Sequence, residues 1–345
     1  MLFRSHVHSE WIEANKDFPN SYTHHYNKQG WIENDDIELN KPPNTYRIFY
    51  VGDSFTEGTV PMDESLPSLV EKHLNLEHTS SGINFEVINT GTSSYSPVIY
   101  YILIRYYLSK YSPDLIVINV DMSDDFDDWK YANTLVRDAE GNPYAVLPVD
   151  IYNRSFIDTQ NGMLKAGLLE KIQLFLFENS SIYNLIARKI STNRSDKINI
   201  EKMIKDNTLY YRWAWVKHQW DEQTIKNVAF SMSILDRIVQ YCDNQNIKVM
   251  LTGVPHYPQF IHTDDGQRYW SKRPHQEIQN IAEKNGIAYL DSIEALEEQI
   301  SNTAQDVYYY KKDMHLNPKG YILWSEAHIN FLMDRKNGLL PGAVY

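Results

Sequence analysis

Short β-strand patterns alternate with longer helical patterns along this chain, and that alternation limits its possible folds more than any other feature. Each strand pattern is a run rich in β-branched and aromatic residues, typical of a strand buried on both faces. Strands and helices in this order form parallel sheets covered by helices on both faces. We predict strands at 46–51, 85–89, 114–120, 247–253 and 287–291, and helices at 64–76, 97–111, 221–245, 273–285 and 321–335. The fold class is therefore α/β, a three-layer doubly wound sheet of about five parallel strands.

A serine follows the first of these strands directly, in the sequence Gly-Asp-Ser-Phe-Thr-Glu-Gly at 52–58. Open α/β sheets bind ligands beyond the carboxyl ends of their strands, so Ser54 is placed at the edge of a pocket. Near the C-terminus, Asp313 and His315 lie in a loop just before the last helical pattern. A histidine can take a serine proton and return it, and an acid on its other ring nitrogen fixes the tautomer. Alternatively, Ser54 only caps a helix and Asp313 only begins a turn.

These blocks resemble those of the SGNH/GDSL hydrolases over roughly residues 45–335. The resemblance implies that Ser54 is the nucleophile, His315 the general base and then general acid, and Asp313 the group that orients the imidazole. It also implies a flavodoxin-like strand order, 2-1-3-4-5. Most of the family spaces its last pair as Asp-x-x-His, whereas this chain has Asp-x-His, a spacing that also occurs among polysaccharide-modifying relatives.

The family builds its oxyanion hole from three donors, and this chain departs from two of them. The resemblance implies the Ser54 backbone N–H as the first donor. Ser94 occupies the usual glycine position of the second block, which keeps a backbone N–H if Ser94 adopts the required φ. Asp124 replaces the asparagine of the third block, and an ionised carboxylate has no proton to donate. Three outcomes stay open: Asp124 is protonated and donates, it points away and leaves the hole to backbone donors, or hydrolysis is lost.

Asp53, Asp125 and His256 are further candidates for a substrate pocket; His256 follows the fourth predicted strand. The acidic run at 121–128 is also rich in hard oxygen ligands, but it lacks the ligand spacing and the bend glycine of a calcium loop. A solvated acidic loop is the simpler interpretation. The histidines at 6, 8, 24 and 25 are expected to lie on the surface, without thiolate partners. We therefore predict no metal and no cofactor.

The third and fourth predicted strands are separated by far more residues than an ordinary crossover needs. We expect a hairpin at 134–138 and 144–149, mixed helical spacing at 168–190, and a densely aromatic run at 210–215. Because this insertion leaves the carboxyl end of the third strand, it is expected to lie beside Ser54 as a lid. The chain divides into an N-terminal extension (1–44), a hydrolase domain (45–128 and 221–345) and the insertion (129–220).

Charge and hydropathy exclude several classes of partner. A formal net charge of -12 argues against nucleic acid and anionic membranes, and no segment is apolar enough to span a bilayer. The first residues lack the apolar core of a secretory signal, so the protein is cytoplasmic as the chain stands, or extracytoplasmic if an export segment was removed. A single cysteine, Cys242, excludes an internal disulfide framework. Neither the acyl chain nor the oligomeric state follows from the sequence.

Together these features predict a serine esterase that hydrolyses O-acyl esters, in particular O-acetyl esters, through an acyl-enzyme. Carbohydrate is the favoured alcohol. Two alternatives remain: an O-acyltransferase that uses the same triad, and a catalytically impaired glycan-binding module whose oxyanion hole has decayed.

Overall fold

The computed structural model describes residues 9–13, 22–79, 82–132, 134–146, 212–311 and 313–341, and the account below concerns these residues. The helical spacing predicted at 168–190 and the tyrosines at 210 and 211 lie outside them. Within the described residues, no helix is long and apolar enough to cross a membrane.

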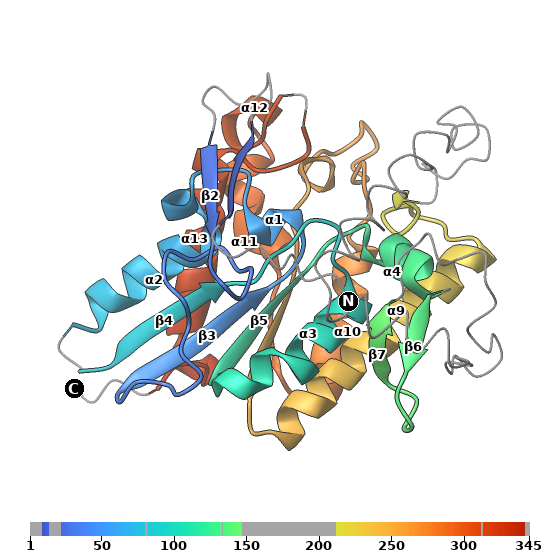
Figure 1. Ribbon diagram of the computed structural model, residues 1–345. Helices are drawn as coiled ribbons and strands as arrows, with labels where there is room; N and C mark the ends of the chain where they lie inside the picture. Colours follow the sequence, from blue (N-terminus) through green and yellow to red (C-terminus); the bar gives the residue numbers. More distant parts are fainter. Residues whose placement is uncertain are drawn as a thin grey trace.

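A five-stranded parallel sheet forms the centre of the molecule (Figure 1). Its strands are β3 (Thr45–Val51), β4 (Asn84–Asn89), β5 (Leu115–Val120), β8 (Lys248–Gly253) and β9 (Ala288–Leu290). They lie in the order β4-β3-β5-β8-β9, and every neighbouring pair is parallel. This is the 2-1-3-4-5 order, so the predicted fold class and all five strands are confirmed, with the long insertion after the third strand.

Alternate residues of each strand enter two separate apolar cores, one on each face of the sheet. Along β3, Ile48 and Tyr50 pack on one face, whereas Phe49 and Val51 pack on the other. Strands buried on both faces need apolar residues at nearly every position, which explains the unbroken runs in the sequence.

Three helices cover each face. One face is covered by α2 (Leu66–Glu77), α11 (Ser292–Ile300) and α13 (Pro318–Met333), and the other by α3 (Pro97–Tyr106), α9 (Glu222–Asn244) and α10 (Arg273–Asn285). Five of these match the predicted helices; α11 was not predicted, and neither was the single turn α12 (Gln305–Tyr308). The helix predicted at 97–111 divides, because the backbone leaves the α conformation at Tyr107 and continues as η2 (Leu108–Tyr111).

The acidic run after β5 is a helix, α4 (Asp124–Ala132), and the expectation of a solvated acidic loop was wrong. Its first five residues are all buried. The hydrophobic pattern gave no sign of this, because carboxylates are rarely buried without a charged partner. A short antiparallel hairpin follows, β6 (Leu135–Arg137) and β7 (Pro143–Val146), in the predicted place; residues 147–149 of the prediction lie outside the described residues.

The N-terminal segment follows one edge of the sheet. Strands β1 (Ser9–Glu13) and β2 (Tyr22–Tyr26) form an antiparallel pair, and Ile32 bridges to Asn89 at the end of β4. His24 is fully buried in this segment, and its Nε2 lies 2.9 Å from the carbonyl oxygen of Val60, so the expectation that it lies on the surface was wrong. The N-terminal segment therefore packs on the chain just beyond Ser54.

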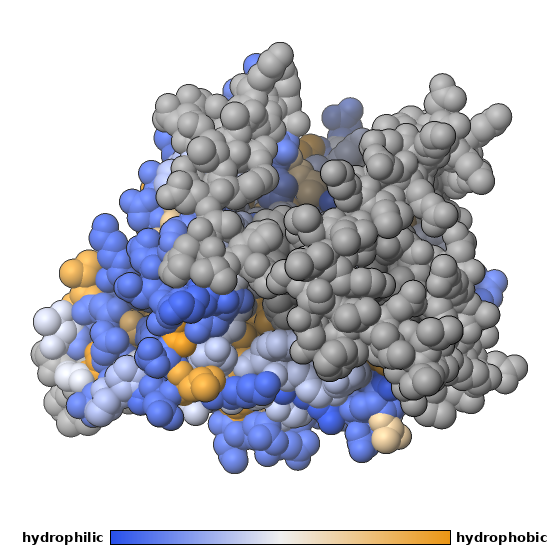
Figure 2. Space-filling view, viewed as in Figure 1, coloured by the Kyte–Doolittle hydropathy of each residue, from blue (hydrophilic) through white to orange (hydrophobic). Residues whose placement is uncertain are grey.

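Figure 2 shows the same side of the molecule as a surface, where the coloured residues are mainly hydrophilic. Two of the large apolar side chains that are more than a third exposed, Leu76 and Tyr144, lie on different elements, α2 and β7. Isolated exposed apolar residues of this kind are ordinary for a globular protein.

Candidate active site

Ser54 stands at the junction between β3 and the single helical turn α1 (Ser54–Glu57). Gly52 permits the tight turn, because a Cβ at this position would lie 2.1 Å from Oγ1 of Thr56. The helix is capped by Asp53, whose carboxylate accepts the backbone N–H of Phe55 at 2.9 Å. The hydroxyl of Ser54 lies 3.3 Å from the other carboxylate oxygen of Asp53, and a closer partner comes from a distant segment.

That partner is His315. Ser54 Oγ lies 2.8 Å from His315 Nε2, and His315 Nδ1 lies 2.5 Å from Asp313 Oδ1. An ionised carboxylate only accepts hydrogen bonds, so Nδ1 carries the ring proton and Nε2 accepts from the Ser54 hydroxyl. The three residues, separated by some 260 positions in the sequence, form one hydrogen-bonded chain.

With the Asp-x-His spacing, Asp313 accepts two hydrogen bonds from His315. Its Oδ1 accepts both the backbone N–H of His315, at 2.9 Å, and the ring Nδ1–H. Burial alone would raise the pKa of Asp313, but the hydrogen bonds and charge interaction with His315 outweigh it and hold the pKa below its usual range. The turn and the imidazole are thus fixed by the same carboxylate.

The second block supplies a loop whose backbone conformation suits a donor. Ser94 has a φ of +62°, the left-handed conformation that a glycine would adopt without strain. Gly91, earlier in the loop, has no room for a side chain, because a Cβ there would lie 2.2 Å from the backbone nitrogen of Glu57. The loop therefore rests directly against the helical turn that carries Ser54.

Asp124, at the asparagine position, is 1% exposed. Its Oδ2 accepts the backbone N–H of Asp121 at 3.1 Å, and Oδ1 has no hydrogen-bond partner within the described part of the chain. Burial, and then the charges of Asp121 and Asp53, raise the pKa of Asp124 well above its usual range. A carboxyl in this environment retains its proton at a pH where a solvated aspartate has lost it.

Asp121 itself pairs with His256, at 2.7 Å between Oδ2 and Nε2, and both side chains are 1% exposed. Burial alone would raise the pKa of Asp121, but the interaction with His256 outweighs it and lowers the pKa to about 2. The other oxygen of Asp121 accepts the N–H and the hydroxyl of Ser123. This pair fixes the turn from β5 into α4, and with it the position of Asp124.

The three substrate-pocket candidates are all buried in this structure. Asp53 is 5% exposed and caps α1, while His256 is bound to Asp121. Asp125 is 0% exposed, and neither of its carboxyl oxygens has a partner among the described residues. Burial is the main reason that the pKa of Asp125 is raised well above its usual range.

Phe55 joins the two histidine–aspartate pairs. Its ring centroid lies 4.5 Å from that of His315 and 4.8 Å from that of His256. His256 in turn contacts the half-buried rings of Trp213 and Trp270, at 5.4 and 5.6 Å. Ring contacts therefore extend from the triad, through the buried rings of Phe55 and His256, to two half-buried tryptophans on other segments of the chain.

Despite the number of buried acids, the described residues hold no group of three His, Cys, Asp or Glu side chains arranged to bind a metal ion. Individual carboxylates instead accept hydrogen bonds from neighbouring groups. Asp128 Oδ1, for example, accepts the Ser96 hydroxyl and the Val98 N–H at the start of α3.

The sequence argument overlooked two functional candidates. Glu57, inside the Gly-Asp-Ser block, is 4% exposed and accepts hydrogen bonds from Tyr26 and Ser93. Asp121 was considered only as one of several acids. No local signal separates a buried, bonded carboxylate from an exposed one, because its partners come from distant segments.

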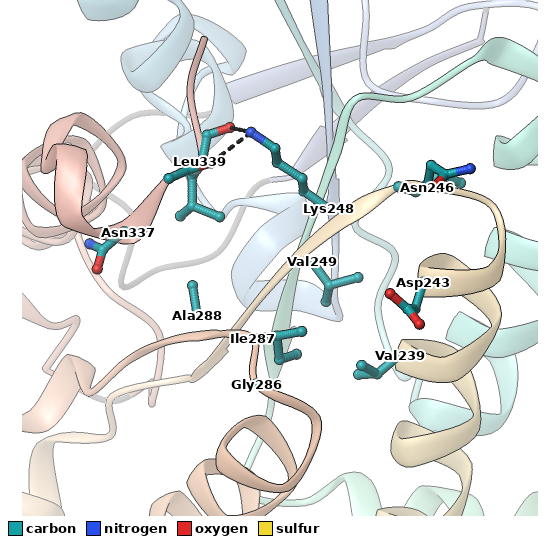
Figure 3. A pocket seen from close by; sticks show the side chains of 12 residues that line it. Val239, Asp243, Asn246, Lys248, Val249, Gly286, Ile287, Ala288, Asn337 and Leu339 are labelled. Carbon is teal, nitrogen blue, oxygen red and sulfur yellow. Dashed lines mark hydrogen bonds between the residues drawn. The ribbon is translucent and has the colours of Figure 1, made fainter. Parts of the chain in front are cut away.

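A hollow of about 390 Å³ lies at the opposite end of the sheet from Ser54, by the amino ends of β8 and β9 (Figure 3). Lys248 points across it and donates to the carbonyl oxygens of Gly338 and Leu339, at 2.6 and 3.2 Å. Because ligands of parallel α/β sheets bind at the carboxyl ends of the strands, we assign the candidate active site to Ser54 and not to this hollow.

No protein-family model matches the chain, and no curated protein matches it. Among solved structures, the chain is similar to a two-domain esterase (CEX) active on acetylated mannans, at 11% identity and a TM-score of 0.46. That match covers 87% of this chain and 51% of the esterase, so this chain spans about half of its length. It is also similar to Axe2, an acetylxylan esterase from Geobacillus stearothermophilus, at 11% identity, with 84% and 94% covered and a TM-score of 0.47. The chain is similar in structure to these two esterases at low sequence identity.

Proposed function

We propose that this protein is a serine ester hydrolase of the SGNH/GDSL type, with Ser54 as nucleophile. The observation that carries the proposal is the hydrogen-bonded chain from Ser54 through His315 to Asp313, at 2.8 and 2.5 Å. A capping serine alone does not account for it, because Asp53 caps the helix and the Ser54 hydroxyl is directed to an imidazole. A turn-forming aspartate alone does not account for it either, since Asp313 also binds the ring of His315.

In this mechanism Ser54 Oγ bonds to the ester carbonyl carbon while its proton passes to His315 Nε2. The tetrahedral intermediate collapses, the bond to the alcohol breaks, and His315 returns the proton to the leaving alcohol. Water then attacks the acyl-enzyme by the same route. Asp313 holds the ring tautomer and stabilises the imidazolium. The backbone N–H groups of Ser54 and Ser94, with Asp124 as a neutral acid, receive the oxyanion.

The proposed substrates are O-acyl, in particular O-acetyl, esters of carbohydrates. The half-buried rings of Trp213 and Trp270 support a sugar, because large aromatic faces pack well against flat apolar surfaces such as sugar ring faces. The net charge of -12 favours a neutral substrate over an anionic one. Trp213 belongs to residues 212–220, the described end of the predicted insertion, and we propose that this end contributes to the site.

A glycan-binding module is the second candidate, and Asp124 is the observation that favours it. If that carboxyl ionises, it removes a donor and places a negative charge where the oxyanion forms. The protein would then bind glycan without hydrolysing its esters. In that case glycan affinity survives Ser54→Ala, and the wild-type protein hydrolyses no ester.

The experiment is covalent labelling with a fluorophosphonate probe, read as intact mass, for wild type and Ser54→Ala. We expect one adduct on the wild type and none on the variant, together with hydrolysis of a short-chain aryl ester by the wild type alone. No adduct on folded wild-type protein would reject the esterase and favour the binding module. Release of acetate with and without a sugar acceptor then separates hydrolysis from acyl transfer.

A further inference from the structure

Glu57 has an unusual environment for a carboxylate this close to a nucleophile. It is the last residue of α1, three positions after Ser54, and it is 4% exposed. Its Oε1 accepts the hydroxyl of Tyr26 at 2.8 Å, and its Oε2 accepts the N–H and the hydroxyl of Ser93 at 2.7 and 2.5 Å. Three donors from two distant segments therefore converge on one carboxylate.

The Ser93 bond acts on the loop that contains Ser94. The loop is held before and after the Ser94 amide: Glu57 holds the Ser93 N–H, and the Tyr131 hydroxyl donates to the Ser94 carbonyl at 2.8 Å. Further back, Gly91 packs against the backbone of α1, and the Thr92 N–H donates to Gly52. Among the described residues, no hydrogen bond occupies the Ser94 N–H itself.

A left-handed serine needs such support, since an L-residue at φ +62° relaxes to another conformation unless its surroundings hold it. An oxyanion donor is effective only if it is already oriented when the charge develops. We propose that Glu57 is a positioning residue: its carboxylate holds the Ser93–Ser94 loop so that the Ser94 N–H is presented to the oxyanion. This inference rests on the proposed esterase function.

Hydrogen bonds from the N-terminal segment also reach the groups that hold the Ser93–Ser94 loop. Tyr26, on β2, donates to Oε1 of Glu57, whereas Ser93 donates to Oε2. Glu33 accepts the N–H of Asn89 at 2.9 Å, and the side-chain oxygen of Asn89 accepts the N–H of Gly91 at 3.0 Å. Tyr26 and Glu33 of the N-terminal segment thus hold the loop that contains Ser94, through Glu57 and Asn89. The N-terminal segment therefore supports the site in addition to covering the sheet edge.

The test compares Glu57→Ala and Glu57→Gln with wild type. Glutamine can still accept from the Ser93 N–H through its oxygen and donate to the Tyr26 hydroxyl through its amide. Glu71→Ala is the matched control. Like Glu57, the Glu71 carboxylate accepts a backbone N–H, but its partner is Val87 on β4, at 2.7 Å and away from the site. The readouts are kcat and KM for an aryl acetate, and the inhibition constant of a boronic acid that forms a tetrahedral adduct with Ser54.

We expect Glu57→Ala to lower kcat about 10- to 100-fold, with KM nearly unchanged and the boronate bound more weakly by a similar factor. Glu57→Gln should recover most of the activity, and Glu71→Ala should behave as wild type. Equal kcat and equal boronate affinity in folded Glu57→Ala would overturn the inference. So would a loss confined to KM.

Two milder variants cover the case in which Glu57→Ala does not fold. Ser93→Ala removes the hydroxyl that donates to Glu57, and Tyr26→Phe removes the hydroxyl of β2 that donates to Glu57. Each should lower kcat and boronate affinity together by a smaller factor, and no change in either variant would reject the inference. If wild-type protein itself takes no fluorophosphonate adduct, the proposed function has failed; if wild type reacts and every variant matches it, only the role of Glu57 has failed.

Discussion

Replacing Asp124 by asparagine or by alanine tests the least ordinary feature of the site. The structure leaves one oxygen of Asp124 bonded to the Asp121 N–H and the other without a partner, so the side chain has one position from which to donate. Asparagine keeps that arrangement, with its oxygen on the Asp121 N–H and its amide nitrogen in the place of the buried, unpartnered oxygen. Alanine removes the donor. Loss of one oxyanion donor costs about 3 to 4 kcal/mol, or about 100- to 1,000-fold in kcat.

The expected pH dependence follows from the raised pKa of Asp124. At low pH the carboxyl is protonated and donates; as pH rises through its raised pKa, the proton is lost and the carboxylate repels the oxyanion. Wild-type kcat should therefore fall at high pH, while Asp124→Asn should hold a plateau there. Near neutral pH the two should differ by no more than a few fold.

The assay is kcat for a short-chain aryl ester across pH, with unfolding temperature as the control for each variant. Two results would refute the reasoning. If Asp124→Asn falls as far as Asp124→Ala at every pH, the side chain is no neutral donor. If Asp124→Ala keeps wild-type kcat, the backbone N–H groups of Ser54 and Ser94 form the whole hole.

Two other predictions follow from single carboxylates. Asp313→Asn keeps an oxygen for the His315 N–H but loses the charge on the ring, so kcat should fall by up to about 10⁴-fold with little change in unfolding temperature; an active variant would contradict this role. Asp128→Asn should stabilise the fold at high pH. Burial, partly offset by hydrogen bonds, raises the pKa of Asp128 from 3.8 to about 7. The native state then binds a proton that the unfolded state has lost, and stability falls by up to about 4 kcal/mol as pH rises between these values. Between about pH 4 and pH 8, urea unfolding should show a smaller loss of stability for Asp128→Asn than for wild type. Equal losses in the two proteins would contradict the raised pKa of Asp128.

The fold was largely predictable because its signals are local. A run such as Ile48–Val51 is apolar at every position, and only a strand buried on both faces needs that pattern. The elements that the sequence did not predict also have a physical explanation. The helix α4 begins with four carboxylates among five residues, so its hydropathy indicated solvent, whereas hydrogen bonds and raised pKa values accommodate those acids inside the protein.

The sequence by itself indicated which residues form the proposed triad. Ser54 follows a predicted strand, Asp313 and His315 precede the last predicted helix, and the resemblance of these blocks to the SGNH/GDSL hydrolases implies the role of each. Tertiary structure alone decided what surrounds them. It set the left-handed backbone of Ser94, the partners of Glu57 and the pairing of Asp121 with His256, since each depends on groups that approach from distant parts of the chain. A carboxylate's protonation and role follow from its burial and its partners, and local sequence specifies neither.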